Sequence, residues 1–297
     1  MRLPHIFIGI LVAAIWGLSF VVMKMGLGNM PPLLLCFMRF FLTCFPAIFF
    51  VKKPNMPWYK IMSYGLIMFA IKFSLLFAGI YVGLTAGLAS LLIQLQVYFT
   101  LFLAVIVLKE AISFRQVLSA IVAGLGLVDI ISHVGHGAPA FGLLFIVLSA
   151  FSWGIGNIIS TSINKANIMG LVVWGSLFAW PLLLLVSLYV DGVHRIMITL
   201  YHISWVEIAA ILFMAYPVTL FGFYMWSWLL NKYDVSTIVS FGLLIPVFGM
   251  LGSIIVFGEP LQSWKLMASL FIIGGLYINM SQIKKSSFLK YETGQTK

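Results

Sequence analysis

The stretch that decides the fold is residues 85–108, TAGLASLLIQLQVYFTLFLAVIVL, which contains no charged side chain. As an α-helix rising about 1.5 Å per residue, it is long enough to cross the ~30 Å hydrocarbon core of a bilayer. Similar runs fill most of the chain, which is 63% hydrophobic and only 8% charged. Because lipid offers no partner to unpaired backbone groups, and these runs are continuous rather than alternating, the sequence predicts an all-α integral membrane protein.

Ten transmembrane helices account for the apolar runs and for the turn residues between them. The second run contains both cysteines, Cys36 and Cys44, which are too far apart along one helix to form a disulfide. Pro246 falls near the middle of the ninth run and is predicted to act as a hinge, because proline removes a helical hydrogen bond. The helices are expected at 5–25, 31–51, 61–83, 85–108, 114–132, 140–161, 167–190, 205–230, 235–257 and 262–282.

The net charge of +10 comes from basic residues scattered between the apolar runs, which predicts membrane orientation and not nucleic-acid binding. If the N-terminus is cytoplasmic, only Lys24, Arg195 and Lys265 fall outside the cell. We therefore expect both termini in the cytoplasm. The basic residues on the cytoplasmic side are then Arg2, Lys52, Lys53, Lys60, Lys109, Arg115, Lys165, Lys232, Lys284, Lys285, Lys290 and Lys297.

The chain also contains a weak internal repeat. Trp153-Gly154 in the sixth predicted helix repeats Trp16-Gly17 in the first, and the spacing of 86–110 matches that of 235–259. An odd number of crossings gives two five-helix units opposite orientations, an arrangement typical of secondary transporters with a substrate site near the midplane. The predicted parts are a first repeat at 1–132, a linker at 133–139, a second repeat at 140–283 and a basic cytoplasmic tail at 284–297.

Several motifs identify a family resemblance that covers nearly the whole chain. They are Trp16 to Gly26, Asn29 to Pro32, Arg39-Phe40, Ala86 to Leu91, Gln94, Gln96, Phe151 to Gly154, Asn157, Pro246 and Gly258-Glu259. They resemble the EamA-type drug/metabolite transporter superfamily, and within it most closely the bacterial exporters of cysteine and O-acetylserine. The resemblance implies ten helices in two EamA repeats, a bacterial inner (plasma) membrane location, and efflux of amino acids or related metabolites. Where that exporter type implies an uncharged polar residue in the third helix, this chain has Lys72.

Arg39 and Lys72 are the two basic residues predicted to lie deep within helices, roughly 12 Å and 16 Å from the outer ends. A cation at the helix centre costs roughly 2.5–3.5 kcal/mol to insert, so each should face a cavity or a partner. We predict that one or both bind the carboxylate of an amino-acid-like substrate. For Arg39 the alternative is a structural role between helices. For Lys72 the alternatives are a structural role and the carrying of a proton, because burial disfavours the charged ammonium.

Other polar and aromatic residues are predicted to line the same substrate site. Residues four apart on a helix share a face, so Trp153 pairs with Asn157 and Gln94 with Tyr98, whereas Gln96 points away from Gln94. For the tryptophans, the alternative to substrate binding is packing between helices. For Lys24, the alternative is that its side chain extends to place the ammonium at the membrane surface. The complete predicted set is Trp16, Ser19, Lys24, Arg39, Lys72, Gln94, Tyr98, Trp153 and Asn157.

The function that fits these features is a secondary-active exporter working by alternating access, because the sequence has no phosphate-binding loop for ATP. Proton antiport and facilitated diffusion remain open. The alternatives are an exporter of toxic organic compounds, an intramembrane enzyme and a channel; no histidine or acidic cluster at mid-membrane depth supports an enzyme. We expect a small-molecule substrate and the lipid bilayer as partners, and no metal, cofactor or nucleic acid. The oligomeric state stays open.

Overall fold

The computed structural model describes residues 1–109, 111–134, 138–161, 168–233, 237–238 and 240–292, and all of its regular elements in these ranges are helical. Elements η2 and η5 are π-helical, whereas η1, η3 and η6 are 3₁₀ turns. In chain order the elements are α1 (Leu3–Gly26), α2 (Pro32–Cys44), η1 (Ala47–Phe49), α3 (Trp58–Tyr64), η2 (Gly65–Ile71), α4 (Lys72–Tyr81), α5 (Ala86–Leu92), η3 (Ile93–Leu95), α6 (Gln96–Leu108), α7 (Phe114–His133), α8 (Ala138–Ser160), α9 (Ile168–Val190), α10 (Val193–Tyr201), α11 (Trp205–Phe213), η5 (Met214–Phe221), α12 (Gly222–Lys232), η6 (Ser240–Leu243), α14 (Leu244–Phe257) and α15 (Ser263–Glu292).

Among the described residues, eight helical stretches are long and apolar enough to cross a membrane, which confirms a multi-pass all-helical protein. The stretch Phe241–Phe257 is apolar but shorter. Two differences from the predicted boundaries stand out. The short helix α10 lies between two predicted spans, and α15 is helical as far as Glu292, past the predicted end of the last span.

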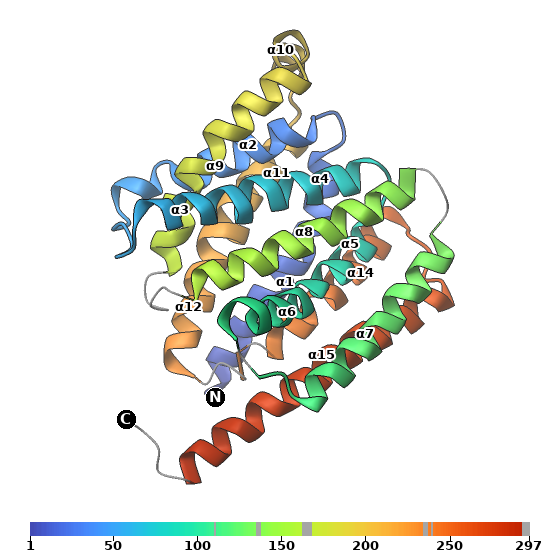
Figure 1. The fold of residues 1–297 in the computed structure, drawn as a ribbon. Helices are drawn as coiled ribbons and strands as arrows, with labels where there is room; N and C mark the ends of the chain where they lie inside the picture. Colours follow the sequence, from blue (N-terminus) through green and yellow to red (C-terminus); the bar gives the residue numbers. More distant parts are fainter. Residues whose placement is uncertain (110, 135–137, 162–167, 234–236, 239, 293–297) are drawn as a thin grey trace.

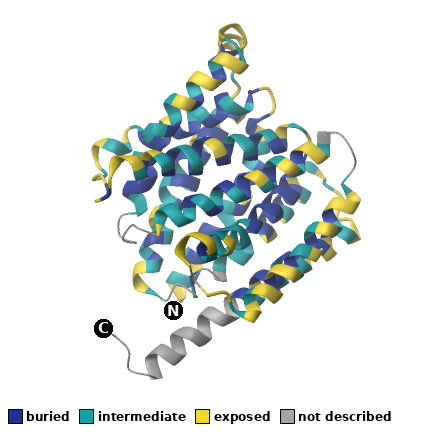
Figure 2. Ribbon diagram, in the orientation of Figure 1, coloured by how far each residue is buried: buried dark blue, intermediate teal, exposed yellow. Residues whose placement is uncertain are grey.

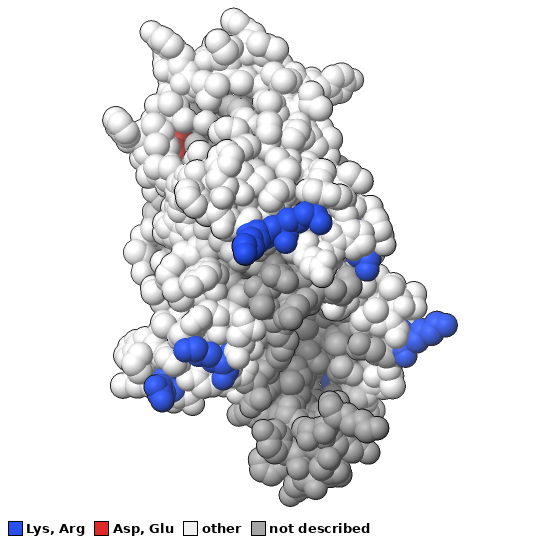
Figure 3. Space-filling view, turned by 90° about the vertical axis from the view of Figure 1, so that its left-hand side faces the viewer, with Lys and Arg blue, Asp and Glu red and all other residues white. Residues whose placement is uncertain are grey.

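The outer surface of the bundle is apolar. Large hydrophobic side chains such as Phe102, Leu185 and Ile255 are 56%, 65% and 78% exposed. Figure 2 shows the buried residues concentrated in the middle of the bundle, and charged side chains are sparse on the face drawn in Figure 3. Because such a surface would be unfavourable in water, these side chains fit the hydrocarbon of a bilayer.

Small residues allow the central helices to pack closely. A Cβ built on Gly17 of α1 would lie 2.5 Å from the carbonyl oxygen of Ile245, and one on Gly249 would overlap the Ser90 hydroxyl. These contacts hold α1, α5 and α14 together. At the edge of the bundle α7 packs along α15, as Figure 1 shows, where a Cβ on Gly275 would lie 2.7 Å from the Ser119 carbonyl oxygen.

Two of the long helical stretches are interrupted by π-helical segments. The stretch from α3 to α4 contains η2, and the stretch from α11 to α12 contains η5, which includes Pro217. Lys72 follows η2 directly as the first residue of α4. Because π-helical segments inside α-helices often mark functional positions, this one draws attention to Lys72.

A second kind of irregularity, a 3₁₀ turn, occurs in two other stretches. The turn η3 separates α5 from α6, and η6 precedes α14. Pro246 therefore lies in the first turn of α14 and not near the middle of a long helix, the position expected from the sequence. Proline is tolerated in a first turn because its missing N–H would have no helical partner there. Its position at a change of helical winding is compatible with a hinge.

Candidate functional site

Two buried cations lie close together in the centre of the bundle, and we refer to Arg39 and Lys72 as the cation pair. Arg39 is 2% exposed on α2 and Lys72 is 3% exposed on α4. The Lys72 Nζ atom lies 3.6 Å from the ring centre of Trp153 on α8 and 3.8 Å from that of Phe73. The guanidinium carbon of Arg39 lies 4.1 Å from the same Phe73 ring. Both cations therefore rest on one shared aromatic ring.

The polar contacts of the cation pair are incomplete. The Nη2 of Arg39 donates to Thr219 Oγ1 at 3.0 Å, and that hydroxyl in turn donates to the Met214 carbonyl at 2.7 Å. The Nε and Nη1 of Arg39 are buried without a hydrogen-bond partner. Within the described part of the chain, the ion pairs are Lys24–Glu259 and His133–Asp129, so neither cation of the pair has a carboxylate. Unsatisfied buried donors of this kind favour binding of an anion.

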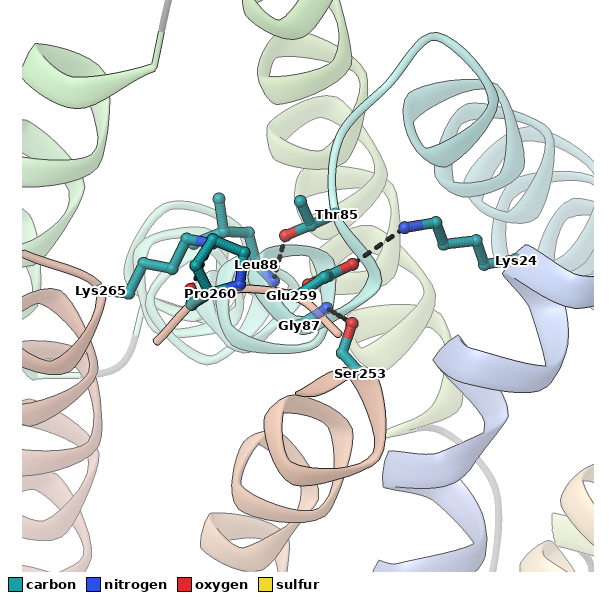
Figure 4. Close-up of polar contacts among 8 residues, drawn as sticks. All are labelled: Lys24, Thr85, Gly87, Leu88, Ser253, Glu259, Pro260 and Lys265. Atoms are coloured by element: carbon teal, nitrogen blue, oxygen red, sulfur yellow. Dashed lines mark hydrogen bonds and ion pairs between the residues drawn. The ribbon is translucent and has the colours of Figure 1, made fainter. Parts of the chain in front are cut away.

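A second charged cluster lies at one end of the bundle, and we call the Lys24–Glu259 ion pair the latch (Figure 4). The Lys24 Nζ at the end of α1 lies 2.9 Å from Glu259 Oε1, in the segment between α14 and α15. The same ammonium lies 4.3 Å from the ring centre of Phe257. Nearby, the backbone N–H of Gly87 donates to Ser253 Oγ at 3.2 Å. The latch therefore joins the ends of α1, α5 and α14.

The ionisation of Glu259 is set by opposing effects. Partial burial raises the pKa of its carboxyl group, but hydrogen bonds from Ser253 and Lys24 and the positive charges of Lys24 and Lys265 together lower the pKa below its usual 4.5. The latch is therefore an ion pair at neutral pH. The hollow beside it, lined by Thr85, Leu88 and Lys265 among others, has room for about one water molecule, which is too little for a metabolite.

The other predicted site residues occupy several different environments. Trp153 contacts Lys72, as described above. Trp16 donates from Nε1 to the Val218 carbonyl at 2.9 Å, and its ring packs 5.0 Å from that of Trp226. Ser19 donates back to the Trp16 carbonyl of its own helix. Trp16 thus faces η5 and α12, and the contacts described for Trp16 and Ser19 are separate from those of the cation pair.

The polar residues of the fourth predicted span, Gln94, Gln96 and Tyr98, each contact a different neighbouring element. Gln94 Nε2 donates to the Gly242 carbonyl at 3.0 Å, which joins η3 to η6. Asn157 Nδ2 donates to Gln96 Oε1 at 2.8 Å and to Thr100 Oγ1 at 3.0 Å. The Tyr98 hydroxyl points toward α15, 2.7 Å from where a Cβ on Gly275 would lie. In these contacts, the predicted site residues Gln94, Tyr98 and Asn157 do not contact Lys72.

Sequence reasoning missed the residues that complete the cation pair. Both cations contact the ring of Phe73, and Thr219 accepts a hydrogen bond from Arg39. Cys36, one turn before Arg39, lies within electrostatic range of both cations. The position of Phe73 next to Lys72 was the available signal. Thr219 is 180 residues from Arg39 in the chain, so nothing local could have paired them. Cys36 and Cys44 are both free, as predicted.

Comparison with known proteins connects this geometry to a family. The model of the EamA-like transporter family matches residues 3–132 and 140–281. A protein of Salmonella typhimurium named "Probable amino-acid metabolite efflux pump" is 37% identical over 280 residues, covering 92% of this chain and 94% of its own. A protein of the same name from Escherichia coli K12 is 34% identical over 279 residues, covering 92% and 93%.

More distant matches agree with the fold. A transporter of Bacillus subtilis described as uncharacterized is 24% identical over 279 residues, covering 90% of this chain and 94% of its own. A solved crystal structure superposes with a TM-score of 0.63 at 16% identity, covering 96% of this chain and 99% of the other. At that identity the likeness bears on the fold alone. From the family match over both halves and the closely related pumps, we conclude that this chain belongs to the EamA-like transporter family.

Proposed function

We propose that this protein exports amino acids or related small metabolites, similar to cysteine or O-acetylserine, by secondary-active transport. The relatives named as amino-acid metabolite efflux pumps support the substrate class. The family is one of transporters, so the chain is a transporter and not an intramembrane enzyme. We further propose a bacterial inner (plasma) membrane location with both termini in the cytoplasm, which places the latch at the outer surface.

The architecture behind this function is two inverted five-helix repeats, in the parts 1–132 and 140–283 joined by 133–139. The helix contacts support it, because exchanging each span for the one five places later preserves the most extensive contacts between helices. The pair α7 and α15 maps onto itself, as does the pair α2 and α9. The contact of α1 with α14 maps onto that of α8 with α6. The π-helical segments η2 and η5 occupy equivalent spans, as do the 3₁₀ turns η3 and η6.

The single observation that carries the substrate proposal is the cation pair. Arg39 and Lys72 are buried, lack a carboxylate partner among the described residues, and lie on the shared ring of Phe73. A substrate carboxylate would receive donors from both, because the Nε and Nη1 of Arg39 have no partner among the described contacts. Charge-assisted hydrogen bonds of this kind are roughly twice as strong as neutral ones.

Alternating access requires the ends of the bundle to open in turn. The latch closes the end that we assign to the outside, and Pro246 at the junction of η6 and α14 is our proposed hinge. Lys72 is a titratable group buried at this site, so it is our candidate for carrying a proton across the membrane. This coupling to the proton gradient is one form of the mechanism, and facilitated diffusion through the same site is the other.

The proposal is tested by counterflow of labelled cysteine into proteoliposomes that contain the purified protein and unlabelled solutes inside. Internal cysteine or O-acetylserine should drive uptake, and protein-free liposomes should show none. Lys72→Met should reduce uptake at least about tenfold, the usual effect of losing a charged hydrogen bond. Lys232→Met is the matched control, because Lys232 is an exposed lysine 4.1 Å from the ring centre of Trp228, far from the cation pair in sequence.

The same assay separates the alternatives. Uptake driven by aromatic or toxic organic compounds, but by no amino acid, would replace the proposed substrate class with that of a multidrug exporter. Large steady currents through a planar bilayer would indicate a channel. Equal transport by the Lys72→Met variant and the wild type would remove the cation pair from the mechanism.

A further inference from the structure

We infer that the cation pair selects metabolites of net negative charge, such as N-acylated amino acids, over zwitterionic amino acids. This inference rests on the proposed function and specifies its substrate class. It begins from the distribution of charge in the chain, which sets what a bound solute meets in the centre of the bundle.

The acidic residues with described side chains have partners other than the cation pair. The chain has seven. Among those with described side chains, Asp129 contacts His133, Asp191 accepts a hydrogen bond from Ser187, Glu207 caps α11 and Glu259 forms the latch. The remaining three, Glu110, Asp234 and Glu292, have no described side chain, and in the sequence each lies within two residues of a described helix end. No acidic residue among those with described side chains is therefore available to receive a substrate ammonium beside Lys72.

Uncharged groups that commonly hold an ammonium are also engaged. The aromatic face of Trp153 is taken by Lys72, and that of Phe73 by both cations. The Thr219 hydroxyl already accepts from Arg39 and donates to the Met214 carbonyl. A free ammonium entering this region would meet two cations and aromatic rings already in contact with them.

The carboxylate of a solute meets the opposite conditions. The buried Nε and Nη1 of Arg39 have no partner, and the Lys72 ammonium is held by aromatic rings alone among the described contacts. A carboxylate satisfies these donors without introducing a third cation. Acylation of the α-amino group removes the positive charge of an amino acid and keeps its carboxylate, so it converts an unfavourable solute into a favourable one.

Two isomers test the inference because they differ only in the position of one acetyl group. At mildly acidic pH, N-acetyl-L-serine is an anion and O-acetyl-L-serine is a zwitterion. Proteoliposomes containing the full-length protein are loaded with one labelled isomer at a time, and initial efflux rates are compared at equal concentration. N-acetyl-L-serine should leave at least about tenfold faster, since discrimination arises from an uncompensated charge in a region of low dielectric constant.

Variants at Lys72 identify the source of the preference. Lys72→Met should slow N-acetyl-L-serine and reduce the preference to less than about threefold, whereas Lys72→Arg, which keeps the charge, should retain it. The thermal melting of each purified variant shows whether it is folded, and Lys72→Arg keeps the test valid if Lys72→Met is unstable. A preference that survives in a folded Lys72→Met variant would overturn the inference.

The outcomes also separate this inference from the proposed function. Equal or faster efflux of O-acetyl-L-serine overturns the anion preference and leaves the export of amino-acid metabolites standing. If neither isomer nor cysteine moves while the protein is folded and inserted, the proposed function fails and the inference fails with it.

Discussion

The latch and the cation pair show two ways in which one membrane protein handles positive charge. Lys24 has a carboxylate oxygen at 2.9 Å, and the pair joins separate helices at one end of the bundle. Lys72 and Arg39 are more deeply buried, yet they contact aromatic rings in place of a carboxylate. A compensated cation holds structure together, whereas an uncompensated one retains the capacity to bind an anion. The difference separates a closing contact from a binding site.

The energies of the contacts support the distinction between a compensated and an uncompensated cation. A cation–π contact contributes about 0.5–2 kcal/mol, whereas burying an ion costs several kcal/mol even after relaxation. The rings of Trp153 and Phe73 therefore offset only part of the cost of burying the cation pair. An anion that arrives from solution can supply the rest, and this is the physical basis for expecting one there.

The largest effect is expected from giving the cation pair a carboxylate of its own. Cys36 is fully buried on α2, within electrostatic range of Arg39 and Lys72, so Cys36→Asp introduces a carboxylate beside both. Transport should fall at least about tenfold because the new side chain competes with the substrate. Initial counterflow rates measure this effect, and thermal melting of the purified protein measures the accompanying stability.

The control is Cys36→Asn, which has nearly the same shape as aspartate and no charge. It should transport faster than Cys36→Asp and melt at a lower temperature, because it leaves the two cations uncompensated. If both variants lost transport equally, the loss would come from altered packing, and the comparison between the two regions would fail.

A smaller effect is expected when the latch loses its compensation. Glu259→Gln removes about 1 kcal/mol of ion-pair energy, which increases the open fraction of this end about fivefold. The readout is the rate at which a membrane-impermeant maleimide modifies Leu88→Cys, introduced at the buried wall of the hollow. The charge exchange Lys24→Glu with Glu259→Lys should return the rate toward that of Leu88→Cys alone, and failure of this rescue would argue against a latch.

The latch should depend little on pH near neutrality. Because the pKa of Glu259 is lowered below 4.5 in the folded protein, the stabilisation is complete above that value and is lost as the pH falls through the lowered pKa. The modification rate of Leu88→Cys, divided by that of a free thiol peptide, should stay constant from about pH 8 to about pH 5.5 and rise below about pH 4. The Glu259→Gln variant should show no such rise, so a rise in both would assign the change to another group.

The smallest effect is expected at Tyr98, which the sequence predicts to be a substrate-binding residue. Its hydroxyl points toward Gly275 on α15, and its described contacts do not include Lys72. Tyr98→Phe should therefore change transport less than about twofold, within the range of an ordinary surface or packing substitution. A loss comparable to that of Lys72→Met would extend the binding site to α15 and weaken the contrast between the two regions.

The sequence by itself determined the class of fold, the family, and which basic residues lie deep within the apolar runs. Long uncharged runs such as 85–108 have one stable form in lipid, so the all-helical membrane fold follows from composition and length. The same reasoning marked Arg39 and Lys72, because a cation within an apolar run is costly wherever the helices pack. It also predicted that Cys36 and Cys44 stay unpaired, since that depends on helix geometry alone.

Only the tertiary structure decided what those residues contact. Lys24 and Glu259 are separated by 235 positions and Arg39 and Thr219 by 180, distances over which no local pattern pairs residues. The same limit applied to Gln94, Tyr98 and Asn157, whose helical faces were readable but whose neighbours depend on how the helices pack. Periodicity fixes the direction of a side chain on its own helix, whereas packing between helices determines whether that direction leads to a binding site, a latch or a neighbouring backbone.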